Sequence, residues 1–282
     1  SGNQRDATSG SFRLDEAYAE ISIPLMENLL LSPAMRFSDH STFGNESTAK
    51  VGLELRPIDD LLVRATWAQG YRAPSISNLF AGNSDSYPAL TDPCNTLNAD
   101  GSTRTILVGG VATPVQVALP GCADVPDGYR QANTQIRITQ VSSPDLKPET
   151  STSSTIGFVY NPSWVEGLEM TVDYYSIEVE DSINRYGAGR LISECSQGEA
   201  FACSFIDRDS NTGTVVDLRN FLQNAGTYEV EGVDAYFAYR MPETSFGTFK
   251  FALDLAHVIT NKFDGEEQVG IQYGDAGYPE WK

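Results

Sequence analysis

Hydrophobic and polar residues alternate along several stretches of this chain. From Ala17 to Leu25 the odd-numbered positions hold Ala, Ile and Leu, while Glu16, Tyr18, Glu20 and Ser22 occupy the even-numbered ones. Successive side chains of a β-strand point to opposite faces of the sheet. The pattern therefore predicts strands with one apolar face and one polar face.

The alternating stretches come in pairs that are joined by short turns. They predict antiparallel hairpins with turns at Glu27–Asn28, Pro57–Asp60, Asn161–Gly167 and Pro242–Gly247. Pro57 suits a turn because its φ is already fixed near the required value. Roughly eight strands result if each stretch forms one strand of the usual length.

The connections between the hairpins are long and polar. They run roughly over His40–Thr48, Arg72–Thr150, Ser182–Gly226 and Thr260–Tyr278. A soluble sandwich seldom places all its short turns at one end and such long loops at the other. Transmembrane barrels have short periplasmic turns and long extracellular loops. We therefore predict an all-β fold, an antiparallel meander that forms part of a large transmembrane β-barrel, with long extracellular loops at about residues 72–150 and 182–226.

The two faces of the predicted strands suit a barrel wall between lipid and a wet lumen. The charged residues expected to face the lumen are Glu20, Arg36, Lys50, Glu54, Arg64, Asp173, Asp234, Lys250 and Asp254. The aromatic residues expected at the membrane interfaces are Trp67, Tyr160, Trp164, Tyr174 and Tyr239. Half-buried strands of a soluble antiparallel sheet alternate in the same way, so only the unequal loops favour the barrel.

Composition excludes some classes of function. The net charge of -19, from 38 acidic and 19 basic residues, repels phosphate backbones, so we expect no nucleic-acid partner. No stretch approaches the roughly 20 apolar residues of a spanning helix. Ser196 and Ser204 lack the surroundings of a hydrolase nucleophile, and no pair of the many carboxylates stands out, so we expect no catalytic residues.

The four cysteines form two pairs that are close in sequence, Cys94 with Cys122 and Cys195 with Cys203. Neither pair has zinc-site spacing, and the two histidines are far apart, so we expect no metal and no cofactor. Disulfides within exposed loops are the favoured interpretation, which implies an oxidising compartment.

The two longest loops contain further local patterns. The apolar run Ile106–Val111 predicts a small hairpin, and Asp207–Gly213 resembles a calcium loop but lacks its closing Glu, which favours a solvated turn. Tyr87, Tyr129 and Tyr186 are candidates for stacking on a sugar or aromatic ligand, although such aromatics more often serve packing.

Three motifs resemble the TonB-dependent receptor family, in matching order and spacing. Trp67–Ser75 resembles the family's aromatic-x-x-Gly-[Phe/Tyr]-Arg-Ala-Pro segment, and Pro144–Thr150 resembles its Asn-Pro-x-Leu-Lys-Pro-Glu element, with Ser143 in the place of Asn. Asn224–Asp234 is similar to the segment in which a Gly-Val-Glu/Asp unit starts a strand. The matching residues are Gly70, Tyr71, Arg72, Ala73, Pro74, Pro144, Leu146, Lys147, Pro148, Glu149, Gly232 and Asp234.

Sequence position gives the motif residues a structural interpretation. Proline cannot donate to a strand ladder and restricts the residue before it, so Pro74 should end a strand at Arg72. Pro148 should stiffen the return of the long loop. We expect these residues to be structural rather than ligand-contacting.

The resemblance implies a transport function. A receptor of this family has about 22 strands around an N-terminal plug, with a segment that contacts TonB (the TonB box) ahead of it. Residues 1–282 are accordingly expected to be a partial barrel, a piece of a longer polypeptide without plug and remaining strands. The implied partners are TonB, through the missing N-terminal parts, outer-membrane lipid of a Gram-negative bacterium, and a small solute such as a siderophore, cobalamin or oligosaccharide. The alternative is a soluble extracellular β-rich glycan-binding or adhesive domain.

Overall fold

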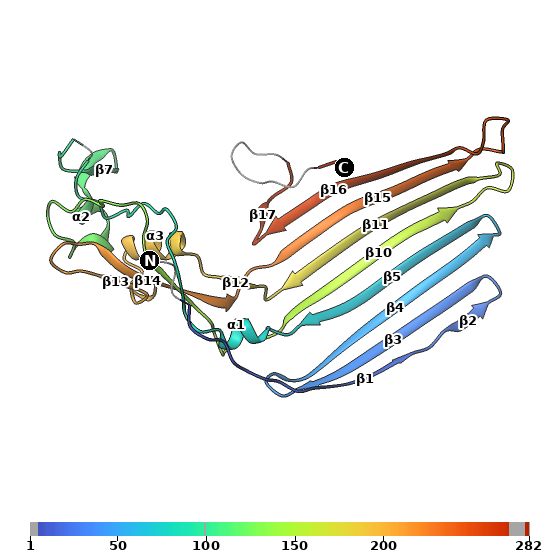
Figure 1. Ribbon diagram of the computed structural model, residues 1–282, viewed down its shortest axis with the longest axis horizontal. Helices are drawn as coiled ribbons and strands as arrows, with labels where there is room; N and C mark the ends of the chain where they lie inside the picture. The colour runs from blue at the N-terminus through green and yellow to red at the C-terminus, as the bar shows by residue number, and fades with distance from the viewer. Residues whose placement is uncertain (1–4, 99, 271–279, 282) are drawn as a thin grey trace. The chain divides into compact units, whose positions relative to one another are not determined.

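The computed structural model describes residues 5–98, 100–270 and 280–281, and the chain forms two compact units (Figure 1). The sheet unit consists of Phe12–Ala73, Lys147–Ser182 and Asn224–Lys282. The loop unit consists of Ser1–Ser11, Pro74–Leu146 and Ile183–Gln223. None of the helices in the described part of the chain is long and apolar enough to cross a membrane.

The sheet unit contains one antiparallel sheet in the order β1-β3-β4-β5-β10-β11-β15-β16-β17, with β2 also paired to β3 (Figure 1). The strands are β1 (Leu14–Glu20), β2 (Ile23–Met26), β3 (Leu29–His40), β4 (Gly44–Ile58), β5 (Leu61–Arg72), β10 (Glu149–Tyr160), β11 (Leu168–Glu180), β15 (Tyr228–Arg240), β16 (Lys250–Phe263) and β17 (Glu266–Glu267). Strands that are neighbours in this sheet also follow one another along the chain, apart from β2 and the strands of the loop unit, and they pair antiparallel. The predicted antiparallel meander is therefore confirmed.

The strands β1 and β2 form one line that is interrupted opposite a proline. Both pair with β3 in a single register, Glu20 opposite Ala34 and Ile23 opposite Leu31. Between them Ile21 donates its backbone N–H to the carbonyl of Pro33. Pro33 has no N–H to donate in return, which interrupts the ladder at this position.

The four short turns lie where the sequence predicts them, between β2 and β3, β4 and β5, β10 and β11, and β15 and β16. One loop prediction is wrong. His40–Thr48 is not a long loop, because β3 extends to His40 and β4 begins at Gly44. The polar residues Asn45–Thr48 pair with β3, so β4 begins earlier than the first apolar residues suggested.

The last predicted loop, Thr260–Tyr278, begins later in the sequence than predicted. Strand β16 extends to Phe263 and pairs with β17. Residues 271–279 of this loop lie outside the described part of the chain.

The apolar face of the sheet is exposed rather than packed against a second layer. On β3 and β4, Met35 is 59% and Val51 41% exposed, and on β16 Phe251 is 61% exposed. Other exposed apolar residues on this face are Ile21, Ile23, Leu25, Phe37, Leu53, Trp67, Ile156, Phe249, Leu253 and Leu255. A soluble sheet buries such a face in its core, so this exposure favours a wall that faces lipid.

The loop unit has its own mixed sheet, in the order β12-β14-β9-β6 with β13 paired to β14, and a separate hairpin β7-β8. Its elements are α1 (Ile76–Phe80), β6 (Ser84–Ser86), β7 (Thr105–Val108), β8 (Val111–Pro114), α2 (Val115–Ala118), the 3-10 helix η1 (Pro120–Cys122), β9 (Ile138–Val141), β12 (Ile183–Arg185), α3 (Ala188–Ser196), α4 (Ala200–Cys203), β13 (Ile206–Arg208) and β14 (Val215–Asn224). The hairpin predicted around Ile106–Val111 is confirmed.

Two small hydrophobic cores stabilise the loop unit. One packs α3 and α4 against Ile138 and Leu218 of the mixed sheet. The other gathers Cys94, Cys122, Val115, Val125 and Tyr129. Disulfides join Cys94 to Cys122 and Cys195 to Cys203.

Both predicted disulfide pairs are confirmed, but the expected exposure is wrong, because Cys94, Cys122 and Cys195 are buried. The reason is that the two long loop segments fold together and enclose their own apolar residues. A unit of this size buries little apolar area, and disulfides commonly supplement such small cores.

Candidate functional site

The polar face of the sheet carries charged side chains from several strands. Arg64 of β5 donates from Nε to Oδ1 of Asp173 at 3.0 Å and from Nη2 to Oδ2 at 2.6 Å. These residues lie on strands that are not adjacent, since β10 runs between them. On β10 the residue opposite both is Gly157. The ion pair therefore crosses a strand at a position that has no side chain.

Two hollows open on this polar face. One, of about 380 Å³, lies over β1, β3, β4 and β5 beside Tyr18, Arg36 and Lys50. The other, of about 370 Å³, lies over β11, β15 and β16 beside Asp173, Asp234 and Asp254. Among the described residues no group of three or more His, Cys, Asp or Glu side chains could hold a metal ion.

Two cations of the first hollow form ion pairs with β1. Arg36 lies 3.8 Å from Glu16, and Lys50 lies 4.0 Å from Glu20. All four side chains are on even-numbered positions, as the alternation predicts for the polar face. Their exposure and long distances make each pair weak, so they remain open to other partners.

The three family motifs meet where strands of the sheet unit end. Arg72, at the end of β5, donates from Nε to Oε2 of Glu149, which begins β10. Asn224 accepts the backbone N–H of Lys147 at 2.7 Å and donates to the carbonyl of Lys147 at 2.9 Å. It also donates to the carbonyl of Asp181 at 2.9 Å. Residues from distant parts of the sequence thus hold the strand ends together.

The other motif residues lie in several different environments. Gly70 and Tyr71 belong to β5, after which Ala73 and Pro74 leave the strand. Pro144 lies in a turn, Leu146 is buried, and Pro148 directly precedes β10. Gly232 and Asp234 belong to β15. A Cβ on Gly232 would lie 2.4 Å from the hydroxyl of Tyr175 and 2.7 Å from the carbonyl of His257, so this close approach needs glycine.

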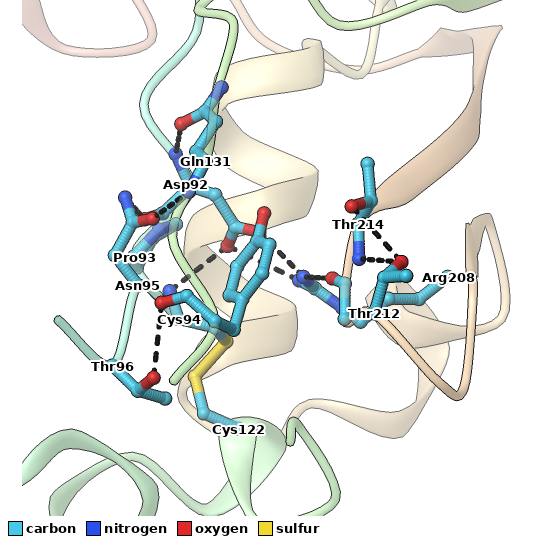
Figure 2. Close-up of polar contacts among 12 residues, drawn as sticks. Asp92, Pro93, Cys94, Asn95, Thr96, Cys122, Gln131, Arg208, Thr212 and Thr214 are labelled. Atoms are coloured by element: carbon cyan, nitrogen blue, oxygen red, sulfur yellow. Dashed lines mark hydrogen bonds and ion pairs between the residues drawn. A yellow bond between two sulfur atoms is a disulfide. The ribbon is translucent and has the colours of Figure 1, made fainter. Parts of the chain in front are cut away.

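A buried ion pair joins the two longer chain segments of the loop unit, Pro74–Leu146 and Ile183–Gln223 (Figure 2). Asp92 is fully buried, and its Oδ2 accepts from Nη1 of Arg208 at 2.5 Å while Oδ1 accepts from Nη2 at 3.2 Å. The hydroxyl of Tyr129 donates to Oδ2 at 2.8 Å, and the backbone N–H of Cys94 donates to Oδ1 at 2.9 Å. Arg208 also donates to the carbonyl of Gly213 at 2.6 Å. Every oxygen of the buried carboxylate is therefore satisfied.

Burial raises the pKa of Tyr129 well above its ordinary value, and the negative charge of Asp92 raises it further. The phenol is therefore a neutral hydrogen-bond donor to Asp92 at physiological pH. Burial lowers the pKa of Arg185, whose Nη1 donates to the carbonyls of Asn220 at 2.8 Å and Val141 at 3.4 Å. Both groups serve the packing of the loop unit.

The candidate ligand-contacting aromatics have different positions in the structure. Tyr129 is buried in the second core, and the hydroxyl of Tyr186 donates to Glu194 at 2.5 Å. Tyr87 is 41% exposed. In the stretch that resembles a calcium loop, Oδ1 of Asp209 accepts from the backbone N–H groups of Asn211 and Thr212, which is a turn stabilised by the aspartate side chain.

Sequence patterns did not single out Asp92 or Arg208. Their ion pair spans 116 positions, and neither residue belongs to an alternating strand of the main sheet or to a family motif. Arg208 lies within the stretch that resembles a calcium loop, but as a cation it is not one of the oxygen ligands that define that pattern. An Asp close to a half-cystine was the only available signal, since Asp92 precedes Cys94 by two residues. In a chain with 38 acidic residues that signal has little weight.

The sheet is an antiparallel meander with one exposed apolar face and one charged face, and its connections include both short turns and long loops. These features together define an arc of a transmembrane β-barrel wall. The sequence matches the model of the family described as TonB dependent receptor-like, beta-barrel over residues 1–280, and the chain belongs to this family. Members of this family are outer-membrane receptors.

Solved structures of siderophore receptors have a similar fold. The ferric enterobactin receptor PfeA of Pseudomonas aeruginosa, in complex with BCV-L6, matches with a TM-score of 0.57 and 16% identity over 91% of this chain and 28% of its own. The siderophore receptor PirA of Acinetobacter baumannii matches with a TM-score of 0.52 and 15% identity over 89% of this chain and 28% of its own. No curated protein matches the sequence. The chain thus spans less than a third of these two receptors, and the low identity shows the fold alone.

Proposed function

We propose that this chain forms part of the wall and the extracellular loops of an outer-membrane receptor that takes up a scarce solute with energy supplied through TonB. The observation that carries this proposal is the exposed apolar face of the sheet. A lipid bilayer accepts that face at no cost, whereas in water it would form an apolar patch far larger than soluble monomers expose.

The opposite face supports a wet lumen. Its Arg64–Asp173 pair and the hollows beside Arg36 and Asp234 are polar and open. Charged groups on a lipid-facing surface are costly, but in a water-filled or plugged lumen they remain solvated. This distribution of charge supports an inner face that contacts the plug or the passing solute.

In this proposal the long connections, about residues 72–150 and 182–226, lie outside the cell. The disulfides of the loop unit are consistent with an oxidising compartment. Its folded core would hold a solute-binding surface in a fixed shape. The solute is a siderophore, a cobalamin or an oligosaccharide. TonB and the plug act through parts of the receptor outside residues 1–282, and we propose no catalytic role.

A transport assay in the bacterium that encodes the receptor tests this function. A strain that lacks the receptor gene should fail to take up one labelled solute of these three classes, and the restored full-length gene should recover uptake. Uptake should also be lost when TonB is deleted. Unchanged uptake of all three classes in the strain without the receptor would contradict the proposal.

A soluble extracellular glycan-binding domain is the second candidate, supported by the separate core of the loop unit. Fractionation distinguishes the two. The receptor should remain with outer membranes and need detergent for extraction, whereas a soluble domain should appear in the aqueous fraction without detergent.

A further inference from the structure

A polar hollow of about 400 Å³ lies on one face of the mixed sheet of the loop unit. Its central row crosses three strands, since Asp85 of β6 is opposite Thr139 of β9, and Thr139 is opposite Arg219 of β14. Cross-strand partners point to the same face, so these three side chains form the floor. The next row adds Arg137 and Asp217, and Asp6 and Asn83 line the hollow from the N-terminal segment and the strand entry.

Donors and acceptors alternate across this floor. Arg137 donates to Asp85 at 3.1 Å and lies 4.0 Å from Asp217. The hydroxyl of Thr139 lies 2.9 Å and 3.0 Å from the two oxygens of Asp217. The Asp85 and Asp217 side chains are 12% and 19% exposed, so they are largely fixed yet remain reachable from the hollow.

The charges of the hollow nearly balance. Asp6, Asp85 and Asp217 are offset by Arg137 and Arg219. An anionic ligand would lie beside three carboxylates, and both guanidinium groups already have partners. Arg137 donates to Asp85, and Arg219 donates to the carbonyl of Ser204 at 2.6 Å and lies 4.0 Å from Asp207. A cationic ligand would have to displace Arg137 from Asp85. A neutral ligand with hydroxyl groups adds hydrogen bonds to the unused lone pairs of the carboxylates without breaking an ion pair.

The same face continues into an aromatic cluster beyond Arg219. The backbone N–H of Arg219 donates to the carbonyl of Phe205, which places Phe205 next in the row. The guanidinium of Arg219 lies 5.9 Å from the ring of Phe205, and Phe205 packs at 4.5 Å from Phe221 and 5.1 Å from Phe201. Phe201 is 55% exposed although it belongs to this cluster.

We propose that this hollow and the exposed edge of the aromatic cluster form a binding site for a neutral glycan, which identifies the solute class of the receptor. Sugar hydroxyls would bond to Asp85, Asp217 and Asn83, and the C–H face of a neighbouring sugar ring would lie on Phe201. Ligand sites commonly measure about 300–1,000 Å³, so the hollow accommodates one or two sugar units. This inference rests on the proposed receptor function, but its test does not depend on transport.

The test is saturation-transfer difference NMR and calorimetry on the full-length receptor in detergent, with maltotriose, cellotriose, xylotriose and galactotriose as separate probes. At least one of these should bind. Asp217→Asn and Phe201→Ala should each weaken that binding about tenfold, because the first exchanges an acceptor oxygen for an NH2 donor and removes the charge that strengthens the hydrogen bonds, and the second removes the aromatic surface. Asn83→Ala, at the rim, should weaken it less and provides a variant with little effect on folding.

Matched controls are Asp124→Asn and Arg130→Gln, which make charge changes at exposed residues of the loop unit outside the hollow. They should leave binding unchanged. The inference is overturned if none of the four probes binds the receptor, if binding is unchanged by Asp217→Asn, Phe201→Ala and Asn83→Ala together, or if a ferric catecholate competes for the same residues. TonB-dependent uptake that persists for another solute would then leave the receptor function standing while this site fails.

Discussion

Arg64 and Asp173 form a two-point ion pair across an intervening strand. The guanidinium of Arg64 reaches the carboxylate at 3.0 Å and 2.6 Å, and β10 passes between their strands with Gly157 opposite both residues. A Cβ on Gly157 would lie 2.1 Å from Oδ1 of Asp173 and 2.4 Å from the carbonyl of Val172. The ion pair and the glycine are therefore one structural feature.

Gly157→Ala should destabilise the barrel wall. The added methyl group overlaps with a backbone carbonyl that cannot rotate away, and it displaces Asp173 from Arg64, so we expect a loss of about 1–3 kcal/mol. Unfolding of the full-length receptor in urea, followed by its gel mobility without heating, measures this loss.

Gly52→Ala is the matched control, because a Cβ there meets Ser32 at 3.7 Å, an ordinary contact. Both glycines lie inside strands, so the difference between the variants isolates the steric conflict. Equal stability of the two variants would show that Asp173 moves aside without cost.

Asn224→Ala should loosen the junction of the three motifs. The side chain of Asn224 makes three hydrogen bonds to backbone groups of Lys147 and Asp181, and their loss should cost about 1–3 kcal/mol in total. Hydrogen exchange at the amide of Lys147 should accelerate in the full-length receptor. Asn211→Ala, in an exposed turn of the loop unit, should not change it. If exchange at Lys147 is equally slow in both variants, the junction does not depend on Asn224.

The main sheet follows from local sequence patterns. Alternation identifies the strands. Turns are marked by Pro57 and by the residues before Gly167 and Gly247, because the geometry of a turn depends on residues that are close together in the sequence. Pro74 and Pro148 mark the strand boundaries at Arg72 and Glu149, where the structure has them. These features need no knowledge of contacts between distant residues, which is why sequence alone predicted them.

The loop unit did not follow from sequence, because it depends on contacts between segments far apart in the chain. Thr139 pairs with Arg219, and Asp92 with Arg208, from two segments that were predicted to be separate loops. Strands of three or four residues are too short to show alternation. The hollow beside Asp217 arises only when these short strands come together.

Asp92→Ala should destabilise the loop unit strongly. The substitution leaves the Arg208 side chain, which is 18% exposed, without its carboxylate partner. Removing one partner of a buried ion pair costs about 3–5 kcal/mol of folding stability. Because Asp92 also accepts from the N–H of Cys94, the Cys94–Cys122 disulfide should become reducible at lower dithiothreitol, as detected by alkylation and mass spectrometry.

Two variants test the cause of that effect. The double variant Asp92→Ala with Arg208→Met should recover part of the resistance to reduction, since no unpaired charge remains buried. Asp100→Ala, an exposed carboxylate of the same unit, should behave as wild type. If the double variant is less resistant than the single one, the unpaired Arg208 is not the source of the instability.

The loop unit should lose stability at alkaline pH through Tyr129. Its folded pKa is raised above the ordinary value near 10.0, so the stabilisation is complete below about pH 10 and falls as the pH rises toward the folded pKa. In wild type, reduction of the Cys94–Cys122 disulfide by dithiothreitol should accelerate across this range. The rates are compared at equal concentrations of the dithiothreitol thiolate, because the reductant itself ionises as the pH rises. Tyr129→Phe should show a smaller increase with pH, because it has no phenol to ionise. An identical increase in both proteins would exclude Tyr129 as the responsible group.

Arginine at two adjacent positions of β16 distinguishes a membrane wall from a soluble sheet. Leu253 lies on the apolar face and is 53% exposed, so in water Leu253→Arg would be harmless or would raise solubility. In a bilayer the same change places a cation in hydrocarbon and costs about 2–4 kcal/mol near the midplane. Ala252→Arg introduces the same residue on the polar face, where a wet lumen solvates it. We therefore expect Leu253→Arg to reduce the amount of folded receptor in outer membranes, measured by gel mobility without heating, and Ala252→Arg to leave it near wild type. Equal tolerance of both substitutions would mean that the apolar face does not contact lipid, and the receptor function would lose the observation on which it rests.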